Sequence, residues 1–120
     1  MYTTPRDQAL AQVESIYALV AELGEATDEA TDEARQRIEE DPLSVEVRSG
    51  WTDTGGALEP EEFRIVLCTG GPHVELQGEL LNGEPCTVRA LYRDWGDSGE
   101  LFEFDHAAVL EYCKCFYFGG

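Results

Sequence analysis

Basic residues are scarce in this chain. Only 8 of its 120 residues are Lys or Arg, against 25 Asp and Glu, so the formal net charge is −17. Nucleic acids and anionic membranes attract surfaces rich in Lys and Arg, and a protein with this charge repels both. The composition therefore excludes direct binding to nucleic acid or to a membrane surface, and it favours a partner whose own surface is basic.

Long apolar runs are also missing. No stretch comes near the roughly 18 apolar residues that a membrane-spanning helix needs, and the N-terminus runs directly into a polar amphipathic segment without the features of a signal peptide. We therefore expect a cytoplasmic protein. In that compartment its four cysteines are expected to be reduced thiols.

Catalytic motifs are absent too. The chain has only two histidines, and its strong negative charge is the opposite of the electropositive setting that activates a cysteine nucleophile. The pairs Gly55-Gly56 and Gly70-Gly71 lack the lysine of a phosphate-binding loop. The sequence predicts no enzyme and no cofactor.

The cysteines offer one weak metal candidate. Cys113 and Cys115 are one residue apart, whereas structural zinc sites use pairs separated by about two to four residues, and no second pair accompanies them. Cys68 and Cys86 lie in predicted strands, where small buried thiols pack as apolar residues. We interpret all four as buried thiols and predict no metal, with zinc at Cys113 and Cys115 as the alternative.

The first 41 residues predict a helical hairpin. Thr4, Pro5 and Asp7 form a helix start, with a capping side chain, proline at the first helical position and an acid in the first turn. Apolar residues recur at helical spacing as far as residue 23, and Gly24 is placed to end the helix. A second helix over 25–41, with Thr27 or Asp28 as its cap, should stop before the proline at position 42.

Alternating apolar residues over 43–104 predict an antiparallel sheet. We expect strands near 43–51, 63–69, 73–81 and 86–95, a short strand at 101–104, and loops at 52–60, 70–72 and 96–99. Asn82-Gly83 is a strong hairpin turn, because both residues accept positive φ. Residues 105–120 then predict a helix from His106 to about residue 114, followed by an aromatic tail that docks on the core. The chain is thus one domain of the α+β class, with two N-terminal helices, an antiparallel meander of four to five strands and a C-terminal helix.

Carboxylates occupy the positions of the second helix that normally form a core-facing stripe. Ala26, Ala30, Ala34 and Ile38 supply only a thin apolar row on the other side. Like charges four residues apart destabilise a helix by a few tenths of a kcal/mol per pair, so this concentration indicates a partner. The acids of the predicted face are Glu25, Asp28, Glu29, Asp32, Glu33, Glu39 and Glu40.

Two loop regions extend the predicted partner-binding surface. The first contributes Asp53, Glu61 and Glu62, and the second contributes Asp94, Trp95 and Asp97. The two tryptophans, Trp51 and Trp95, lie beside loops at predicted strand ends. Tryptophans in such places usually cover the core, and an exposed tryptophan flanked by aspartate is typical of an interface anchor.

With these features, the chain resembles the small acidic inhibitors of phages and mobile elements, the anti-CRISPR and antirestriction proteins. The resemblance is one of type: a short single domain, a strong negative charge, carboxylates along an exposed helix and no catalytic signature. It implies a non-enzymatic inhibitor whose acidic surface mimics nucleic acid and occupies the basic groove of a nucleic-acid-binding host defence complex.

Three other interpretations stay open, and one of them is a zinc- or thiol-dependent enzyme. The chain is alternatively a small structural or adaptor protein of a phage or plasmid, in which acidity serves solubility. The terminal Gly119-Gly120 is similar to the end of ubiquitin-like and sulfur-carrier proteins, although the order of predicted elements differs from theirs and the preceding aromatic residues should hold the tail against the core.

Overall fold

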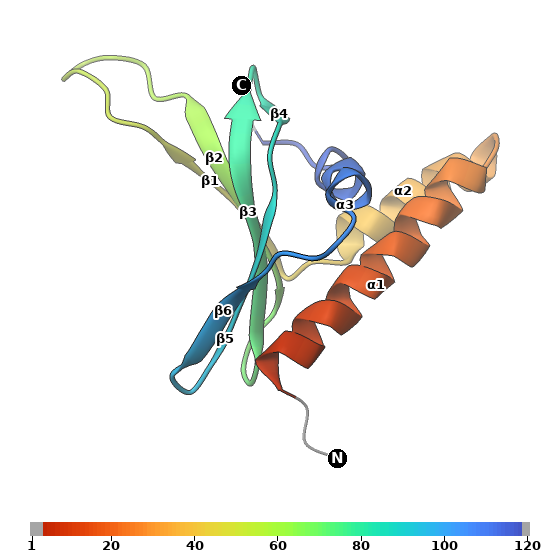
Figure 1. The fold of residues 1–120 in the computed structure, drawn as a ribbon. Helices are drawn as coiled ribbons and strands as arrows, with labels where there is room; N and C mark the ends of the chain where they lie inside the picture. The colour runs from red at the N-terminus through yellow and green to blue at the C-terminus, as the bar shows by residue number, and fades with distance from the viewer. Residues whose placement is uncertain (1–3, 119–120) are drawn as a thin grey trace.

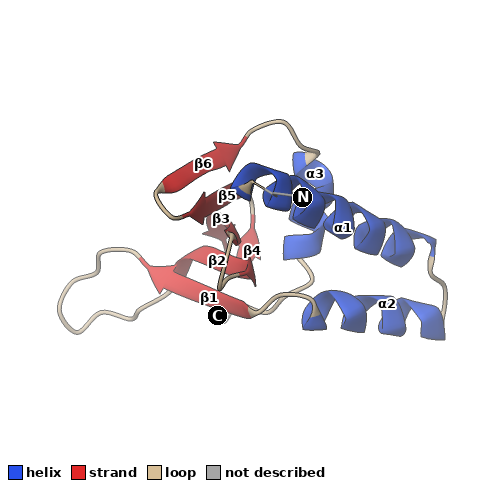
Figure 2. Cartoon of the chain, turned by 90° about the horizontal axis from the view of Figure 1, so that it is seen from below, coloured by secondary structure: helices blue, strands red, loops and turns tan. Residues whose placement is uncertain are grey.

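Three helices cover one face of an antiparallel sheet in the computed structural model, which describes residues 4–118 (Figures 1 and 2). This arrangement confirms the α+β class, with two helices before the sheet and one after it. The sheet has six strands, one more than the upper end of the prediction. Within the described range, no helix is long and apolar enough to cross a membrane. The terminal Gly119-Gly120 lies outside that range.

Helix α1 (Pro5–Glu25) begins where the sequence predicts. Thr4 Oγ1 accepts a hydrogen bond from the Asp7 N–H at 3.1 Å, and the Asp7 carboxylate accepts one from the Thr4 N–H at 3.3 Å. This reciprocal capping box stabilises the helix by about 1 kcal/mol. The predicted end at Gly24 is wrong, because that glycine stays helical and the C-cap is Ala26.

Helix α2 (Glu29–Glu40) begins directly after Asp28, one of the two predicted caps, and not at residue 25, where the predicted acidic helix starts. The chain turns between the helices at Asp28, whose φ of 53° is in the left-handed region, and Asp28 makes no side-chain capping bond. Glu25 therefore belongs to α1 and Asp28 to the connection, so the two residues are not part of the α2 surface as predicted. An ion pair between Arg37 and Glu22 links the two helices.

The strands form a meander, as predicted. They are β1 (Ser44–Ser49), β2 (Pro60–Cys68), β3 (His73–Leu81), β4 (Glu84–Pro85), β5 (Arg89–Asp94) and β6 (Asp97–Leu101). The order across the sheet is β1-β2-β3-β5-β6, all antiparallel, and the short β4 pairs with β3. β1 and β6 are therefore the two edges.

Of the strand predicted over 86–95, only Arg89–Asp94 is strand, and residues 86–88 form an interruption between β4 and β5. At the interruption, the Glu79 N–H donates to Thr87 Oγ1 at 2.9 Å, and the Thr87 carbonyl oxygen lies where a Cβ on Gly78 would be. The close approach therefore requires glycine at position 78.

The predicted loop over 96–99 is also wrong. Asp97, Ser98 and Gly99 are weak strand formers, yet they pair with β5, and the register places Tyr92 opposite Gly99. The predicted strand at 101–104 is reduced to Leu101, the last residue of β6.

The core lies between the helices and the covered face of the sheet. Strands β2, β3, β5 and β6 contribute to it, for example Ile65 opposite Leu76, and α1 contributes Ile16. Fully buried members include Ala9, Ile16, Ile38, Ile65, Val74, Leu76, Ala90, Val109, Tyr112 and Cys113. Because the covered face takes the apolar residues, the open face receives the polar ones.

Helix α3 (His106–Cys113) and the tail close the domain. Asp105 caps α3 by accepting a hydrogen bond from the Ala108 N–H at 3.1 Å, as predicted. The aromatic tail docks, also as predicted: Phe118 is buried, and its ring centroid lies 5.1 Å from that of Phe63. Tyr117, between the two inward-facing phenylalanines of the tail, points outward and is exposed.

Candidate interaction surface

The outer face of α2 carries an uncompensated row of carboxylates. Ala34 and Ile38 are buried on the inner side, with Thr31 half-buried beside them, whereas Ala30 is exposed and was wrongly predicted to face inward. The acids on the opposite side are all exposed: Glu29, Asp32, Glu33, Glu39 and Glu40. None of these five is in an ion pair within residues 4–118.

Half of the basic residues lie instead on the open face of the sheet. Arg48, Arg64, Arg89 and Arg93 occupy it, and three of them pair with glutamates of neighbouring strands. The pairs are Arg48 with Glu62, Arg64 with Glu46 at 3.0 Å, and Arg89 with Glu100 at 2.6 Å. The negative charge is thus partly neutralised on the sheet and left free on α2.

The pairing on the open face has an electrostatic consequence. The hydrogen bond from Arg64 lowers the pKa of Glu46, and the same bond raises the pKa of Arg64. The bond to Glu100 likewise raises the pKa of Arg89. These pairs are exposed, so their contribution to stability is small, but they keep the face close to neutral.

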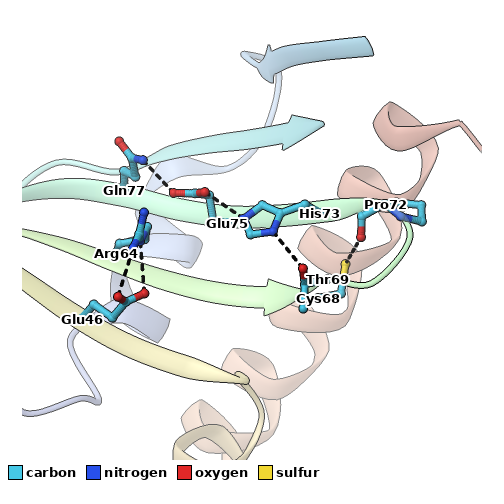
Figure 3. A network of polar contacts seen from close by, with 8 residues as sticks. All are labelled: Glu46, Arg64, Cys68, Thr69, Pro72, His73, Glu75 and Gln77. Carbon is cyan, nitrogen blue, oxygen red and sulfur yellow. Dashed lines mark hydrogen bonds and ion pairs between the residues drawn. The ribbon is translucent and has the colours of Figure 1, made fainter. Parts of the chain in front are cut away.

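A buried carboxylate lies at the centre of this open face (Figure 3). Glu75 is only 4% exposed. One of its oxygens is 2.8 Å from His73 Nε2, and the other accepts a hydrogen bond from Gln77 Nε2 at 2.6 Å. On its far side, His73 Nδ1 is 3.3 Å from Thr69 Oγ1. The neighbours thus satisfy a charge that burial alone would disfavour.

Hydroxyl, imidazole and carboxylate in a line are also the groups of nucleophilic catalysis. In this network, however, the 3.3 Å contact between Thr69 and His73 is longer than the roughly 2.7–3.2 Å of a well-formed hydrogen bond between nitrogen and oxygen. The His73 side chain is also only 15% exposed. We therefore interpret the network as structural support for the open face.

The β1–β2 loop projects away from the domain (Figure 1). Asp53 is exposed on it, and so is Trp51, with a relative exposure of 105%. Glu61 is exposed as well, but Glu62 pairs with Arg48 on the open face, so its charge is partly compensated. Figure 2 shows this loop, the edge strand β1 and α2 along the same side of the molecule.

The β5–β6 turn lies at the other edge of the sheet. Its residues Asp94 and Asp97 flank Trp95, which is 99% exposed, beside a shallow hollow of about 520 Å³. The hollow also includes His73 and Arg93 in its lining. The structure therefore does not bring Asp94, Trp95 and Asp97 together with the acidic face of α2, and the prediction combined two separate surfaces.

Neither Trp51 nor Trp95 covers the core, so the interpretation of the two tryptophans as core-covering residues is wrong. Trp95 also adopts a φ of +45°, which is a true outlier for a bulky side chain. Its turn has the same form as the Asn82-Gly83 turn, whose φ values are 54° and 82°. Strain of this kind, in a turn that asparagine would satisfy, points to a use for the exposed indole.

The cysteines differ in their surroundings. Cys113 is fully buried, and burial raises its pKa; burial also raises the pKa of the half-buried Cys115. Cys68 is half-buried and its thiol donates to the Pro72 carbonyl, whereas Cys86 is exposed, contrary to prediction. Between residues 4 and 118, no three His, Cys, Asp or Glu side chains gather in a way that could hold a metal ion.

The sequence prediction missed the open face with its arginines and with Glu75. A signal was present, because Arg64, Arg89 and Arg93 each alternate with apolar residues at the strand period. The acid excess of the whole chain obscured the local balance of charge on this face.

Comparison with known proteins identified no relative of this chain. The sequence matches no protein-family model, and it has no significant match among the curated proteins or the solved structures with which it was compared.

Proposed function

We propose that this protein is a non-enzymatic inhibitor whose acidic α2 surface occupies a basic, nucleic-acid-binding groove of a host defence complex such as a CRISPR or restriction complex. One observation carries the proposal: the five carboxylates of α2 are exposed and unpaired, while half of the chain's basic residues lie on the open face of the sheet. The charge on α2 is therefore available to a partner.

The physical basis is electrostatic complementarity. A groove lined by Lys and Arg binds rows of phosphate charge, and the α2 carboxylates recur about every 5.4 Å along the helix axis. The hairpin holds α2 in place through Ala34, Ile38 and the ion pair of Arg37 with Glu22. Binding through such a preformed row costs less conformational entropy than binding through a flexible acidic segment, because the helix is already ordered.

The β1–β2 loop is the natural second contact of this surface. It lies on the same side of the molecule as α2, and it exposes Asp53 and Trp51 (Figure 2). Aromatic anchors contribute strongly to protein interfaces when they enter a pocket. We therefore place the footprint on α2 and this loop.

Charge reversal tests the proposal. Glu33→Lys, Glu39→Lys and Glu40→Lys together remove three carboxylates of the α2 face, and two of these changes place a positive charge at the C-terminal end of the helix, where the dipole favours it. We expect the triple variant to stay folded and to lose binding to, and inhibition of, a CRISPR or restriction complex. Wild-type binding should weaken between 50 and 500 mM salt.

A matched control separates local from total charge. Glu79→Lys, Glu84→Lys and Glu103→Lys change the net charge by the same amount at exposed positions off α2. The control should retain binding. Full binding by the α2 triple variant, with its circular dichroism spectrum unchanged, would refute the proposal.

The exposure of Trp95 favours a second candidate, an adaptor or structural protein of a phage or plasmid. Trp51 and Trp95 are associated with opposite edges of the sheet, so they would contact two different neighbours. In that case, Trp51→Ser and Trp95→Ser should each abolish one interaction in a pull-down, and the α2 triple variant should abolish neither.

A further inference from the structure

The edge strand β1 is an unprotected sheet edge. Within the described range it pairs only with β2, so the backbone groups on its other side face outward. Natural proteins usually protect such edges with charged side chains, above all lysine, with proline, with a bulge or with an inward-pointing charge. Residues 44–49 contain no lysine or proline, their two charged residues Glu46 and Arg48 are paired with β2 on the open face, and the only irregularity in the register comes at the end, between Arg48 and Ser49.

The side chains of β1 also leave this edge uncovered. Val45 and Val47 point to the same side as the core residues Ile65 and Phe63, yet they are 37% and 46% exposed, because the helices do not cover this edge. Leu43, just before the strand, is 62% exposed. The opposite edge, β6, differs: its sequence Asp-Ser-Gly-Glu-Leu is polar along most of its length.

We propose that β1 pairs with β1 of a second copy of this chain, antiparallel, with Val47 opposite Val47 on a two-fold axis. The resulting dimer has a continuous sheet. This inference goes beyond the proposed function and does not depend on it.

Charge complementarity selects both the occupant and the register. A two-fold axis at Val47 places Glu46 of each copy opposite Arg48 of the other, on the open face. Across the junction, the open face then reads Arg64 and Glu46 of one copy, followed by Arg48 and Glu62 of the other. Positive and negative charges alternate along this row. Opposite charges in directly opposed positions stabilise a strand pair.

Neighbouring registers lack this match. Because directly opposed residues share a face, a two-fold pairing can shift only in steps that keep the faces aligned. A shift of the axis to Glu46 puts two glutamates against each other, and a shift to Arg48 puts two arginines against each other. Like charges directly opposite destabilise a sheet.

The apolar face favours the same register. The two Val47 side chains cover each other at the axis, and Val45 lies two residues away on the same face. Both valines are among the exposed large apolar side chains of the monomer. The pairing thus covers an apolar stripe of β1 that the monomer leaves in water.

The main opposing force is repulsion between two chains of formal charge −17. The acidic helix α2 lies on the same side of the molecule as β1 (Figure 2), so both copies of α2 approach the axis. Salt screens this repulsion. Self-association should therefore strengthen as salt rises, whereas binding to a basic partner should weaken, and this difference separates the two proposals.

Sedimentation equilibrium of the full chain tests the pairing. We expect a monomer–dimer equilibrium that shifts toward dimer between 50 and 500 mM NaCl. Val47→Lys puts two like charges on the axis and should raise the dissociation constant on the order of tenfold or more. The matched control Ser98→Lys, on the other edge, should leave it unchanged. A chain that stays monomeric at all salt concentrations overturns the proposal, whether or not Val47→Lys affects the binding of another protein.

A cysteine scan tests the register. Val45→Cys, Val47→Cys and Ser49→Cys all lie on the same face of β1, but only position 47 faces itself across the axis. Under mild oxidation, disulfide-linked dimers should form with Val47→Cys well above the wild-type background, which the exposed Cys86 sets. Preferential cross-linking at position 45 or 49 would overturn the proposed register.

Discussion

Tyr112 donates its phenolic hydrogen to Asp41 Oδ2 over 2.7 Å. The bond joins the buried end of α3 to the residue that caps α2, so it links the acidic helix to the core. Burial, followed by the hydrogen bond to Asp41, raises the pKa of Tyr112 well above its ordinary value. A structural contact at the base of α2 is thus also a source of pH dependence.

Stability should decline at alkaline pH, and Tyr112 accounts for part of the decline. Below about pH 8, Tyr112 and Cys113 are mostly protonated in both the folded and unfolded chain. Above about pH 9 for Cys113 and pH 10 for Tyr112, the unfolded chain releases a proton that the folded chain keeps, because both folded pKa values are raised. Each group then lowers the free energy of unfolding by about 1.4 kcal/mol per pH unit.

Denaturant unfolding between pH 8 and 11 measures this effect. Tyr112→Phe should lose about 1 kcal/mol at pH 8, where the hydrogen bond to Asp41 is missing, but its decline above pH 10 should be shallower than that of the wild type. Tyr117→Phe, at an exposed position, is the control and should follow the wild type. Equal slopes in the wild type and Tyr112→Phe would contradict the assignment.

Two glycine-to-alanine changes should have opposite effects. A Cβ on Gly78 would overlap the Thr87 carbonyl and the Phe63 ring, so Gly78→Ala should destabilise the fold by about 1–3 kcal/mol. Gly24 is helical with open space around it, so Gly24→Ala should stabilise by about 0.5–1 kcal/mol. Thermal melts of both variants are sufficient, and a stable Gly78→Ala would show that the β4–β5 interruption readily moves.

Trp95→Asn should stabilise the protein. The φ of +45° suits asparagine and strains tryptophan, and relief of the strain should contribute about 1 kcal/mol. Trp51→Asn, where φ is not positive, should leave the free energy of unfolding within about 0.5 kcal/mol. If Trp95 is an interface anchor, its variant gains stability and loses binding to its partner. A destabilised Trp95→Asn would count against strain in the turn.

Glu75 should matter more than its exposed neighbours on the same strand. Glu75→Ala leaves His73 and Gln77 without their carboxylate partner in a nearly covered site, which should destabilise by about 1–3 kcal/mol. Glu79→Ala, on the same face but exposed, is the control and should change stability by less than about 0.5 kcal/mol. Chemical denaturation compares the two, and equal effects would contradict the importance of the network.

Local signals predicted much of the fold. The capping residues at Thr4 and Asp105 and the Asn82-Gly83 turn depend on neighbours within a few positions, and all three occur as predicted. The prediction failed where contacts distant in sequence prevailed. β6 forms from weak strand formers because β5 pairs with it, and the strand predicted from residue 86 begins only at Arg89, after Thr87 meets Gly78.

The sequence also predicted only part of the candidate surface. Helical periodicity predicted the exposed acids of α2, because burying a whole face of carboxylates in the core is unfavourable. It also assigned Glu25 to that helix, because no local signal showed that Asp28 would turn the chain in the left-handed region. The sequence did not determine whether Trp51 and Trp95 are exposed, since a tryptophan beside a loop can be either buried or exposed.

The sequence by itself determined the sign and scale of the charge, the alternation of the strands and the positions of the main turns, because these depend on composition and short-range geometry. Only the tertiary structure decided where that charge is compensated. The sheet register places arginines beside glutamates on the open face, and the packing of α2 against α1 leaves its carboxylates unpaired. Pairing across strands depends on residues far apart in the chain, and that is why it becomes visible only in the fold.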